Sequence, residues 1–173
     1  MGNVLIINGT HSDNSRVYGV QQHIEKYFDD AKSIKVYDLP AEALISADYQ
    51  NETIKAANKL IEEAAGIIIL TPVYKASYSG ILKTFLDLIP QKGLENKIIL
   101  PVAVGGSPYH MLATDYALKP VLSALGATTI LQSVYIIDKF IEQTDDGFII
   151  QKEEQKRLEL QLLKLKSKVA LPA

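Results

Sequence analysis

The sequence contains no cysteine and no tryptophan among its 173 residues, and only Arg16 and Arg157 are arginines. Without cysteine the chain forms no disulfide, offers no thiolate nucleophile and holds no cysteine-ligated zinc. An excess of one charge is also lacking, because 18 basic and 20 acidic residues leave a net charge of −2. This balance argues against a nucleic-acid binder. The three histidines, His11, His23 and His110, show no metal-site spacing, so no metal is expected.

Long apolar runs are missing as well. The longest are Ile67–Leu70 and Ile98–Val104, far below the roughly 20 residues that a membrane span requires. The segment Met1–Ile7 has no basic region and does not resemble a signal peptide, and Ile6 stands where a myristoylation motif has Ser or Thr. We therefore expect a cytoplasmic protein without membrane contact. The length and the 47% hydrophobic content predict a single domain over residues 1–173.

Short apolar runs alternate with longer amphipathic segments along the chain. The pattern predicts strands at 4–7, 34–37, 66–70, 97–104 and 129–137, and helices at 15–28, 53–65, 79–88, 110–125 and 153–169. Apolar strands that alternate with helices indicate a parallel sheet covered on both faces. We expect an α/β, flavodoxin-like three-layer sandwich whose five parallel strands have the order 2-1-3-4-5.

Two segments interrupt this regular pattern. Pro101 lies inside the fourth predicted strand and removes a ladder donor, so we expect either a bulge there or a strand that begins after it. Residues 138–150, with Asp145-Asp146-Gly147, are expected to form a hairpin before the last helix. A plain solvated loop is the alternative.

Three loops are expected to form the ligand site. In a parallel α/β sheet, ligands bind beyond the carboxyl ends of the strands where the strand order reverses, which here lies between strands one and three. The loops that reach this edge are Asn8–Ser15, Thr71–Ser79 and Gly105–His110. They are the three loops richest in Gly, Pro, Ser and Thr, so composition and topology indicate the same place.

The first loop has the features of a phosphate site. It leads from a strand to a helix N-terminus, where free N–H groups and the helix dipole favour an anion. Thr10, Ser12 and Ser15 offer hydroxyls, and Arg16 adds a positive charge. The alternative is that Ser15 or Asn14 only caps the helix. Neither a Gly-x-Gly-x-x-Gly nor a P-loop motif is present, so a mononucleotide such as FMN fits better than a dinucleotide or an NTP.

The other two loops fit a flat ring. Pro72 is expected to end the third strand, Tyr74 and Tyr78 can flank a ring, and Lys75 can favour negative charge on it, although packing is the alternative for each tyrosine. Ser79 is expected to cap the next helix. In the third loop, Gly105-Gly106 allows close approach of the backbone, and His110 is a weaker candidate for ligand contact. A Gly-x-Ser-x-Gly hydrolase motif is absent.

Two longer runs resemble a known family. The run from Thr71 to Asp87 (TPVYKASYSGILKTFLD) is similar to the signature of NAD(P)H-dependent FMN reductases of the flavodoxin-like superfamily. The run from Asp115 to Leu125 (DYALKPVLSAL) resembles the reductases of two-component alkanesulfonate systems, which pass reduced FMN to a monooxygenase. The resemblance covers Val4 to about Val134 and fades over the last forty residues.

The resemblance implies FMN as cofactor and NADPH or NADH as hydride donor, with no catalytic side chain. It implies that the phosphate lies on Thr10, Ser15 and Arg16, and that the ring lies against 72–75 and 105–107 with the nicotinamide stacked on it. The full set of expected flavin contacts is Thr10, Ser12, Ser15, Arg16, Val17, Pro72, Val73, Tyr74, Lys75, Ala76, Gly105, Gly106, Ser107 and His110. The first loop of such proteins often reads Gly-Ser-Pro-Arg, whereas here it reads Gly-Thr-His-Ser. An arginine is therefore missing, which suggests weaker binding of FMN or its use as a substrate.

Pro120 predicts an irregular helix. A proline cannot donate to the carbonyl four residues back, here that of Tyr116, so a kink or a π-bulge is expected. In the resembled reductases a π-helix with an inserted tyrosine lies at the tetramer interface. The resemblance therefore implies that Tyr116 lies at a subunit contact of a homo-oligomer, a dimer or a tetramer, with a surface tyrosine beside a simple kink as the alternative.

The expected reaction is hydride transfer from nicotinamide C4 to flavin N5, with reduced FMN supplied to a partner monooxygenase. Three alternatives remain open at this point. The protein could be a quinone or azo-dye reductase with tightly bound FMN, or a flavodoxin-type electron carrier without pyridine-nucleotide activity, although such carriers are usually strongly acidic. The third is a structural oligomer with a vestigial pocket.

Overall fold

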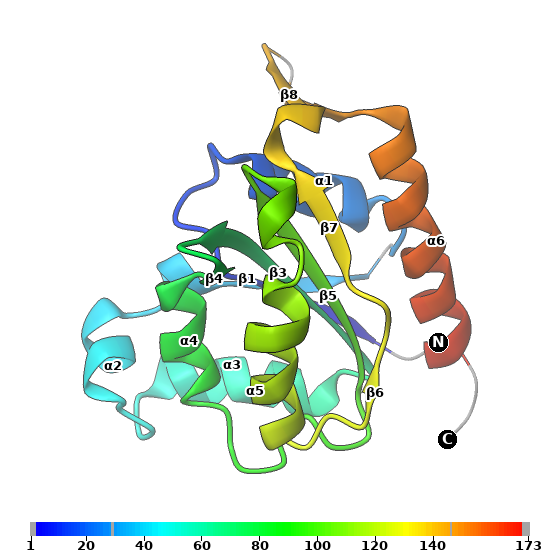
Figure 1. Ribbon diagram of the computed structural model, residues 1–173. Helices are drawn as coiled ribbons and strands as arrows, with labels where there is room; N and C mark the ends of the chain where they lie inside the picture. The colour runs from blue at the N-terminus through cyan, green and yellow to red at the C-terminus, as the bar shows by residue number, and fades with distance from the viewer. Residues whose placement is uncertain (1–2, 29, 146, 171–173) are drawn as a thin grey trace.

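The computed structural model describes residues 3–28, 30–145 and 147–170, and its centre is a parallel sheet. The strands lie side by side in the order β2 (Lys32–Lys35), β1 (Val4–Asn8), β3 (Gly66–Tyr74), β5 (Ile98–Gly105) and β6 (Thr129–Ile130). β7 (Val134–Ile137) continues the edge that β6 begins, and both pair with β5. Counting β6 and β7 as one divided strand gives the predicted order 2-1-3-4-5. The flavodoxin-like α/β fold is therefore confirmed (Figure 1).

Helices cover both faces of this sheet (Figure 1). One face packs against α1 (Arg16–Glu25) and α6 (Lys152–Val169). The other packs against α2 (Ala41–Ser46), α3 (Glu52–Glu63), α4 (Gly80–Leu86) and α5 (Lys119–Ala124). Of these helices, only α2 is absent from the sequence prediction.

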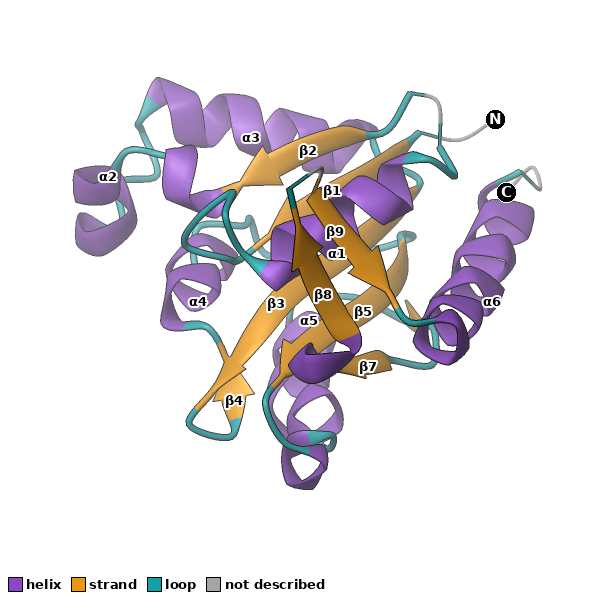
Figure 2. Cartoon of the chain, turned by 90° about the horizontal axis from the view of Figure 1, so that it is seen from above, coloured by secondary structure: helices purple, strands orange, loops and turns teal. Residues whose placement is uncertain are grey.

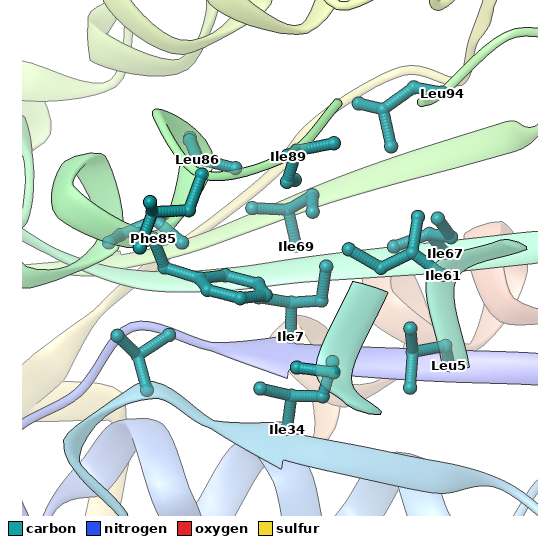
Figure 3. Packing of buried hydrophobic residues seen from close by; sticks show 14 of the residues in the cluster. Leu5, Ile7, Ile34, Ile61, Ile67, Ile69, Phe85, Leu86, Ile89 and Leu94 are labelled. Carbon is teal, nitrogen blue, oxygen red and sulfur yellow. The ribbon is translucent and has the colours of Figure 1, made fainter. Parts of the chain in front are cut away.

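Alternation along the strands supplies both cores. In β1, Leu5 and Ile7 point to the α3–α4 side, whereas Val4 and Ile6 point to the α1–α6 side. Figure 3 shows Ile7 beside Phe85 of α4 and Ile69 of β3, and Leu5 beside Ile61 of α3 and Ile67 of β3. Because the central strands β1, β3 and β5 are apolar on both faces, their register is fixed and their carboxyl ends form one defined edge.

β5 includes Pro101 as a regular strand residue, whereas the sequence analysis expected a bulge there or a strand that begins after it. β5 runs through Pro101, which pairs with Ile69 of β3. On the outer side, β6 pairs with β5 only at Ile98 and Ile99, and β7 begins at Val102. Pro101 thus lies opposite the break between β6 and β7, where its missing N–H interrupts no pairing.

The third strand is longer than predicted and the second is shifted. β3 continues through Pro72, which pairs with Val104, and then turns into the short antiparallel β4 (Ser77–Tyr78). β2 ends at Lys35, and the next three residues, Val36–Asp38, form a turn of 3-10 helix. The longer β3 extends the sheet at the edge where the ligand loops lie, whereas β2 ends two residues earlier there than predicted.

The helix predicted at 110–125 is divided into three parts. Pro108–His110 is a 3-10 turn, Thr114–Leu118 is π-helical, and α5 follows. The N–H of Lys119 donates to the carbonyl of Thr114, five residues back. The expected π-bulge is therefore confirmed. It begins before Pro120 because the proline cannot donate the bond that a regular helix would form there.

The segment after β7 forms the predicted hairpin. β8 (Ile141–Thr144) pairs antiparallel with β9 (Gly147–Ile150), while Asp146 lies outside the described residues. Seen from above, the hairpin lies over α1 (Figure 2). A Cβ on Gly19 of α1 would lie 2.4 Å from the side chain of Phe148, so the close packing of the hairpin on α1 requires glycine there.

Candidate active site

A hollow of about 300 Å³ lies at the carboxyl ends of β1, β3 and β5. All three loops expected at this edge contribute to it, together with residues after β7. Its lining consists of Thr10, Asn14, Ser15, Arg16, Val17, Pro72, Val73, Tyr74, Val104, Gly105, Gly106, Asp138 and Gln143. Nine of the fourteen expected contacts are in this set, and Ser12, Lys75, Ala76, Ser107 and His110 are not.

A larger hollow of about 750 Å³ lies between α3 and the segment 88–97, away from these strand ends. Two of the lysines that line it, Lys55 and Lys92, already pair with Glu52 and Glu95. It contains neither a glycine-rich loop nor the start of a long helix. We therefore place the active site in the smaller hollow, where the strand topology and the chemistry of the loops coincide.

The first loop brings two hydroxyls together at the start of α1. Thr10 Oγ1 lies 3.0 Å from Ser15 Oγ. Ser15 Oγ also accepts a hydrogen bond of 3.1 Å from the N–H of Tyr18, so Ser15 is the N-cap of α1, as the capping alternative proposed. The N–H groups of Arg16 and Val17 have no intrahelical partner. The cap and an anion site are therefore compatible at the same helix end.

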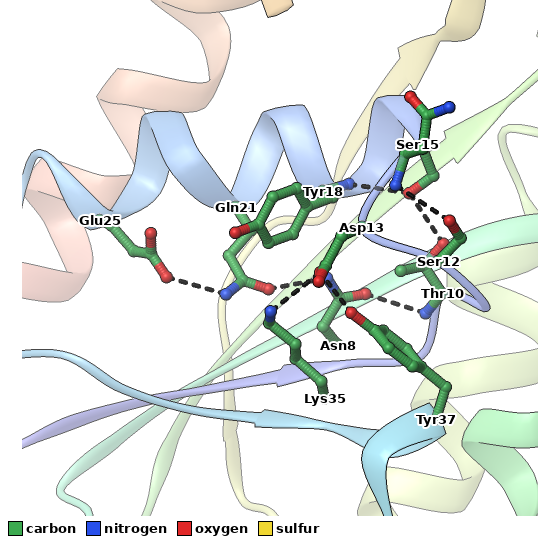
Figure 4. Close-up of polar contacts among 11 residues, drawn as sticks. Asn8, Thr10, Ser12, Asp13, Ser15, Tyr18, Gln21, Glu25, Lys35 and Tyr37 are labelled. Atoms are coloured by element: carbon green, nitrogen blue, oxygen red, sulfur yellow. Dashed lines mark hydrogen bonds and ion pairs between the residues drawn. The ribbon is translucent and has the colours of Figure 1, made fainter. Parts of the chain in front are cut away.

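A second set of contacts holds the outer part of this loop (Figure 4). Tyr37 Oη donates to Asp13 Oδ1, and Lys35 Nζ lies 2.9 Å from the same oxygen. The hydrogen bonds from Tyr37 and Lys35 lower the pKa of Asp13, and burial with the bond to Asp13 raises the pKa of Tyr37 to about 12. Ser12 Oγ accepts from the N–H of Asn14 at 2.9 Å, outside the hollow. Ser12 therefore shapes the loop and is not a lining residue.

The second loop is a tight hairpin that brings only part of its expected residues to the hollow. Pro72, Val73 and Tyr74 line the hollow, but the chain then turns at Lys75 and Ala76, whose φ values are 49° and 61°. Both are positive, as a type I′ turn requires, and both residues are turned out of the lining. The centroid of the Tyr74 ring lies 5.7 Å from that of the His11 ring, and Tyr74 is half exposed.

Ser79 joins the second loop to the first. Its Oγ donates to the carbonyl of Gly9 at 2.6 Å and accepts from the N–H of Leu82 as the N-cap of α4. The predicted cap is confirmed. A Cβ on Gly9 would lie 2.6 Å from Leu82 Cβ, so the two loops approach this closely only because residue 9 is glycine.

The two glycines of the third loop differ in what surrounds them. A Cβ on Gly105 would lie 2.1 Å from Tyr135 Oη, whereas the nearest atom to a Cβ on Gly106 would be Asp138 Oδ2 at 3.6 Å. Tyr135 Oη donates to the carbonyl of Ser107 at 2.6 Å and fixes the turn. Neither Ser107 nor His110 lines the hollow, because the 3-10 turn that begins at Pro108 carries the chain away.

Asp138 and Gln143 form a wall that the sequence analysis missed. Gln143 Nε2 donates to Asn14 Oδ1 at 2.6 Å, and Arg16 Nε donates to the carbonyl of Ile141 at 3.0 Å. The expected phosphate ligand Arg16 thus also anchors β8. Asp138 directly follows β7, so the rule that ligands lie beyond strand ends would have indicated it, but Gln143 carries no such signal.

The π-helical segment leaves Tyr116 on the surface, where the residue is 79% exposed. Thr114 and Leu118 on either side are buried. Asp115 pairs with Lys119 across the π-turn. The prediction that Tyr116 contacts another subunit remains a prediction.

The donor set fits a phosphorylated flavin. Two hydroxyls, two uncapped helix N–H groups and the Arg16 guanidinium suit a phosphate, and the open backbone at Gly106 with the Tyr74 ring suits a flat aromatic group. Within the described ranges, no group of three His, Asp or Glu side chains is placed to hold a metal ion. No helix in the same ranges has both the length and the apolarity of a membrane span.

Comparison with known proteins agrees with this geometry. A family model described as NADPH-dependent FMN reductase matches residues 3–142. An FMN reductase (NADPH) of Pseudomonas putida is 41% identical over 160 residues, covering 88% of this chain and 81% of that protein. The FMN reductase (NADPH) of Escherichia coli is 50% identical over 97 residues, 56% of this chain and 51% of that protein. A crystal structure of an NADH:FMN oxidoreductase in its apo form superposes with a TM-score of 0.83 at 34% identity, covering 97% of this chain and 90% of that one. The chain belongs to the NADPH-dependent FMN reductase family, a family of flavodoxin-like oxidoreductases.

Proposed function

We propose that this chain reduces FMN with NAD(P)H and supplies reduced FMN to a partner flavin-dependent monooxygenase. The observation that carries the proposal is the pair of hydroxyls of Thr10 and Ser15 at the start of α1, which faces the Gly105-Gly106 backbone across one hollow. Such a site grips a single phosphate at one end and leaves room for a ring at the other. Family membership gives the redox chemistry, and this chain's own residues give the binding.

The phosphate would be held by the first loop and α1. Ser15 Oγ accepts from Thr10 Oγ1 and from the N–H of Tyr18, which leaves its own O–H to donate to the phosphate. The N–H groups of Arg16 and Val17 are further donors, and the positive end of the helix dipole adds a favourable field. Arg16 keeps its Nη groups for the ligand while its Nε holds β8. Ser12 has no direct role in this assignment, since its hydroxyl is used by Asn14.

The ring would lie between the ends of β3 and β5. Pro72, Val73 and Tyr74 present one wall and Gly105-Gly106 the other. We assign no direct contact to Lys75, Ala76, Ser107 or His110, because none of them lines the hollow. Backbone N–H groups of this rim are then the groups available to favour negative charge on a reduced ring.

A flavin held in this hollow would supply the hydride chemistry, with hydride moving from nicotinamide C4 to flavin N5. The contribution of the chain would be orientation, with the loops that line the hollow holding one face of the ring and leaving the other open to the nicotinamide. Hydride transfer itself needs no side-chain acid or base, so we name no catalytic residue.

Steady-state oxidation of NADPH and of NADH, with and without added FMN, tests the proposal. A flavin-reducing enzyme that uses FMN as a substrate purifies colourless and shows a rate that saturates with free FMN. A yellow protein that passes electrons to quinones or azo dyes without added FMN would favour the tightly bound alternative. Reduction of bound flavin by a second protein only, with no reaction with NADPH or NADH, would identify an electron carrier and overturn the proposal.

We propose further that Tyr116 contacts a second subunit of a homo-oligomer. Tyr116 is 79% exposed and Tyr109 is 92% exposed, and Met111 and Leu112 between them in sequence are half exposed, so this short segment leaves four large side chains uncovered. Tyr116→Ser should reduce the molar mass found by light scattering. Ile45→Ser is the matched control, since Ile45 is equally exposed on α2. An unchanged mass for Tyr116→Ser would contradict the contact.

A further inference from the structure

A chain of buried amides runs from the surface of α1 to the first loop (Figure 4). Asn8, at the end of β1, has no exposed surface, and Gln21 of α1 is 1% exposed. Asn8 Nδ2 donates to Gln21 Oε1 at 2.7 Å, and Gln21 Nε2 donates to Glu25 Oε1 at 2.8 Å. At the other end, Asn8 Oδ1 accepts from the N–H of Thr10 at 2.9 Å.

The carboxylate at the end of this chain sets its direction. An ionised carboxylate only accepts hydrogen bonds, so Gln21 must turn its Nε2 to Glu25 and its Oε1 to Asn8. Asn8 must then turn its Nδ2 to Gln21, which leaves its Oδ1 for Thr10. An exposed carboxylate on α1 thus fixes which way two buried amides point.

The amide orientation fixes the loop at the phosphate end of the site. With its N–H held by Asn8 Oδ1, Thr10 directs its own hydroxyl to Ser15 Oγ at 3.0 Å. If Asn8 turned its Nδ2 to this N–H instead, two donors would face each other and a buried N–H would lose its partner, which is costly. The loop would then have to move, and the two hydroxyls with it.

We propose that Gln21, acting through Asn8, is a positioning residue for the phosphate loop and sets the selectivity of this chain for FMN over the unphosphorylated flavin, riboflavin. The inference rests on the proposed function, since it assumes that the Thr10–Ser15 pair receives the flavin phosphate. Gln21 does not line the hollow, so its effect reaches the ligand only through the loop.

Binding of FMN and of riboflavin to matched variants tests this. Gln21→Leu removes the acceptor for Asn8 Nδ2, and we expect binding of FMN to weaken about tenfold while that of riboflavin stays within about twofold. The exchanged pair Gln21→Glu with Glu25→Gln keeps an acceptor for Asn8 Nδ2 and a donor at position 25, and should retain most of the selectivity. Gln22→Leu makes the same chemical change at the exposed neighbour on α1 and should have no effect.

A smaller change covers the case in which Gln21→Leu does not fold. Glu25→Ala removes the exposed carboxylate that orients the chain and leaves the buried residues in place, so FMN binding should weaken about twofold or more with riboflavin unchanged. Thermal unfolding of each variant separates loss of stability, which would weaken both flavins alike, from loss of loop geometry.

The outcomes separate this inference from the proposed function. If the wild type prefers FMN, and Gln21→Leu and Glu25→Ala keep the wild-type ratio of FMN to riboflavin affinity, the positioning role is wrong and the proposed function stands. An equal loss for both flavins also overturns the positioning role, because it indicates a structural effect. A wild type that binds neither flavin would instead remove the proposed function.

Discussion

Thr10 Oγ1 lies 3.0 Å from Ser15 Oγ, across the turn that leads from β1 into α1. Thr10 is 2% exposed, so its hydroxyl sits on the floor of the site while Ser15 stands at the helix end. Two hydroxyls that share one hydrogen bond keep further donor and acceptor capacity for a ligand. We therefore expect both hydroxyls to be needed for binding of the flavin phosphate.

Replacing Thr10 with Val, which keeps the shape of the side chain, should weaken FMN binding about tenfold and leave riboflavin binding nearly unchanged. Ser15→Ala should do the same and also destabilise the fold by about 1 kcal/mol, since it removes the cap of α1. Asn51→Ala is the control, because Asn51 caps α3 away from the site. It should lose similar stability without any change in FMN affinity. Flavin titration and urea unfolding measure the two effects, and equal losses for both flavins would refute the phosphate assignment.

The two glycines of the third loop should respond differently to alanine. Gly105→Ala places a Cβ 2.1 Å from Tyr135 Oη, so we expect a clear loss of stability that Tyr135→Phe relieves in part. Gly106→Ala meets its nearest atom at 3.6 Å, so stability should hold while the methyl group fills the space meant for the ring. Thermal unfolding and flavin titration distinguish them. Unchanged FMN affinity in Gly106→Ala would place the ring elsewhere.

Residues that favour the conformation of the turn at Lys75 and Ala76 should increase the stability of the protein. Both residues have positive φ values, 49° and 61°, which cost residues with a side chain about 1 kcal/mol each. Asn-Gly is the favoured pair for such a turn, so Lys75→Asn with Ala76→Gly should raise the free energy of unfolding by about 1 kcal/mol. The rate of FMN reduction should be retained, because neither residue lines the hollow. A large fall in rate with Lys75→Asn alone would restore a direct role for the lysine charge.

His23 should make stability depend on pH. Burial lowers the pKa of His23, and the nearby Glu159, 3.2 Å away, offsets only part of this effect while Lys26 adds to it. The folded state therefore binds a proton less readily than the unfolded chain, and the free energy of unfolding should fall as the pH drops below about 6.5. Urea unfolding at about pH 7.5 and about pH 5.5 measures the change. His23→Gln should reduce it, whereas His11→Gln, at an exposed position, should leave it intact.

Sequence patterns were sufficient to predict the strand order and the hollow at the carboxyl ends of the strands. Apolar strands and amphipathic helices carry their signal in local periodicity, and the carboxyl-end rule then brings the loops of Thr10, Pro72 and Gly105 together. The π-helix followed from one local fact, the missing N–H of Pro120. These features are encoded over a few residues each, which is why they could be predicted.

Features that depend on distant partners could not be predicted in this way. Pro101 costs the sheet no hydrogen bond because β6 ends and β7 begins opposite it, and this break is visible only in the assembled sheet. The turn at Lys75 and Ala76 contains neither Gly nor Asn, the residues from which positive φ values would be predicted. Gln143 reaches Asn14 across 129 positions of sequence, so nothing local marks it as part of the site.

The ties between the first loop and β8 couple two parts of the chain thermodynamically. Arg16 holds the carbonyl of Ile141, and Gln143 holds Asn14, so any ligand that orders the loop also disfavours the states in which the hairpin detaches. Because such coupling is reciprocal, a hairpin that opens more easily must lower affinity for the ligand by the same factor. Ligand binding should therefore slow amide hydrogen exchange in β8 and β9, although most of those amides do not line the hollow.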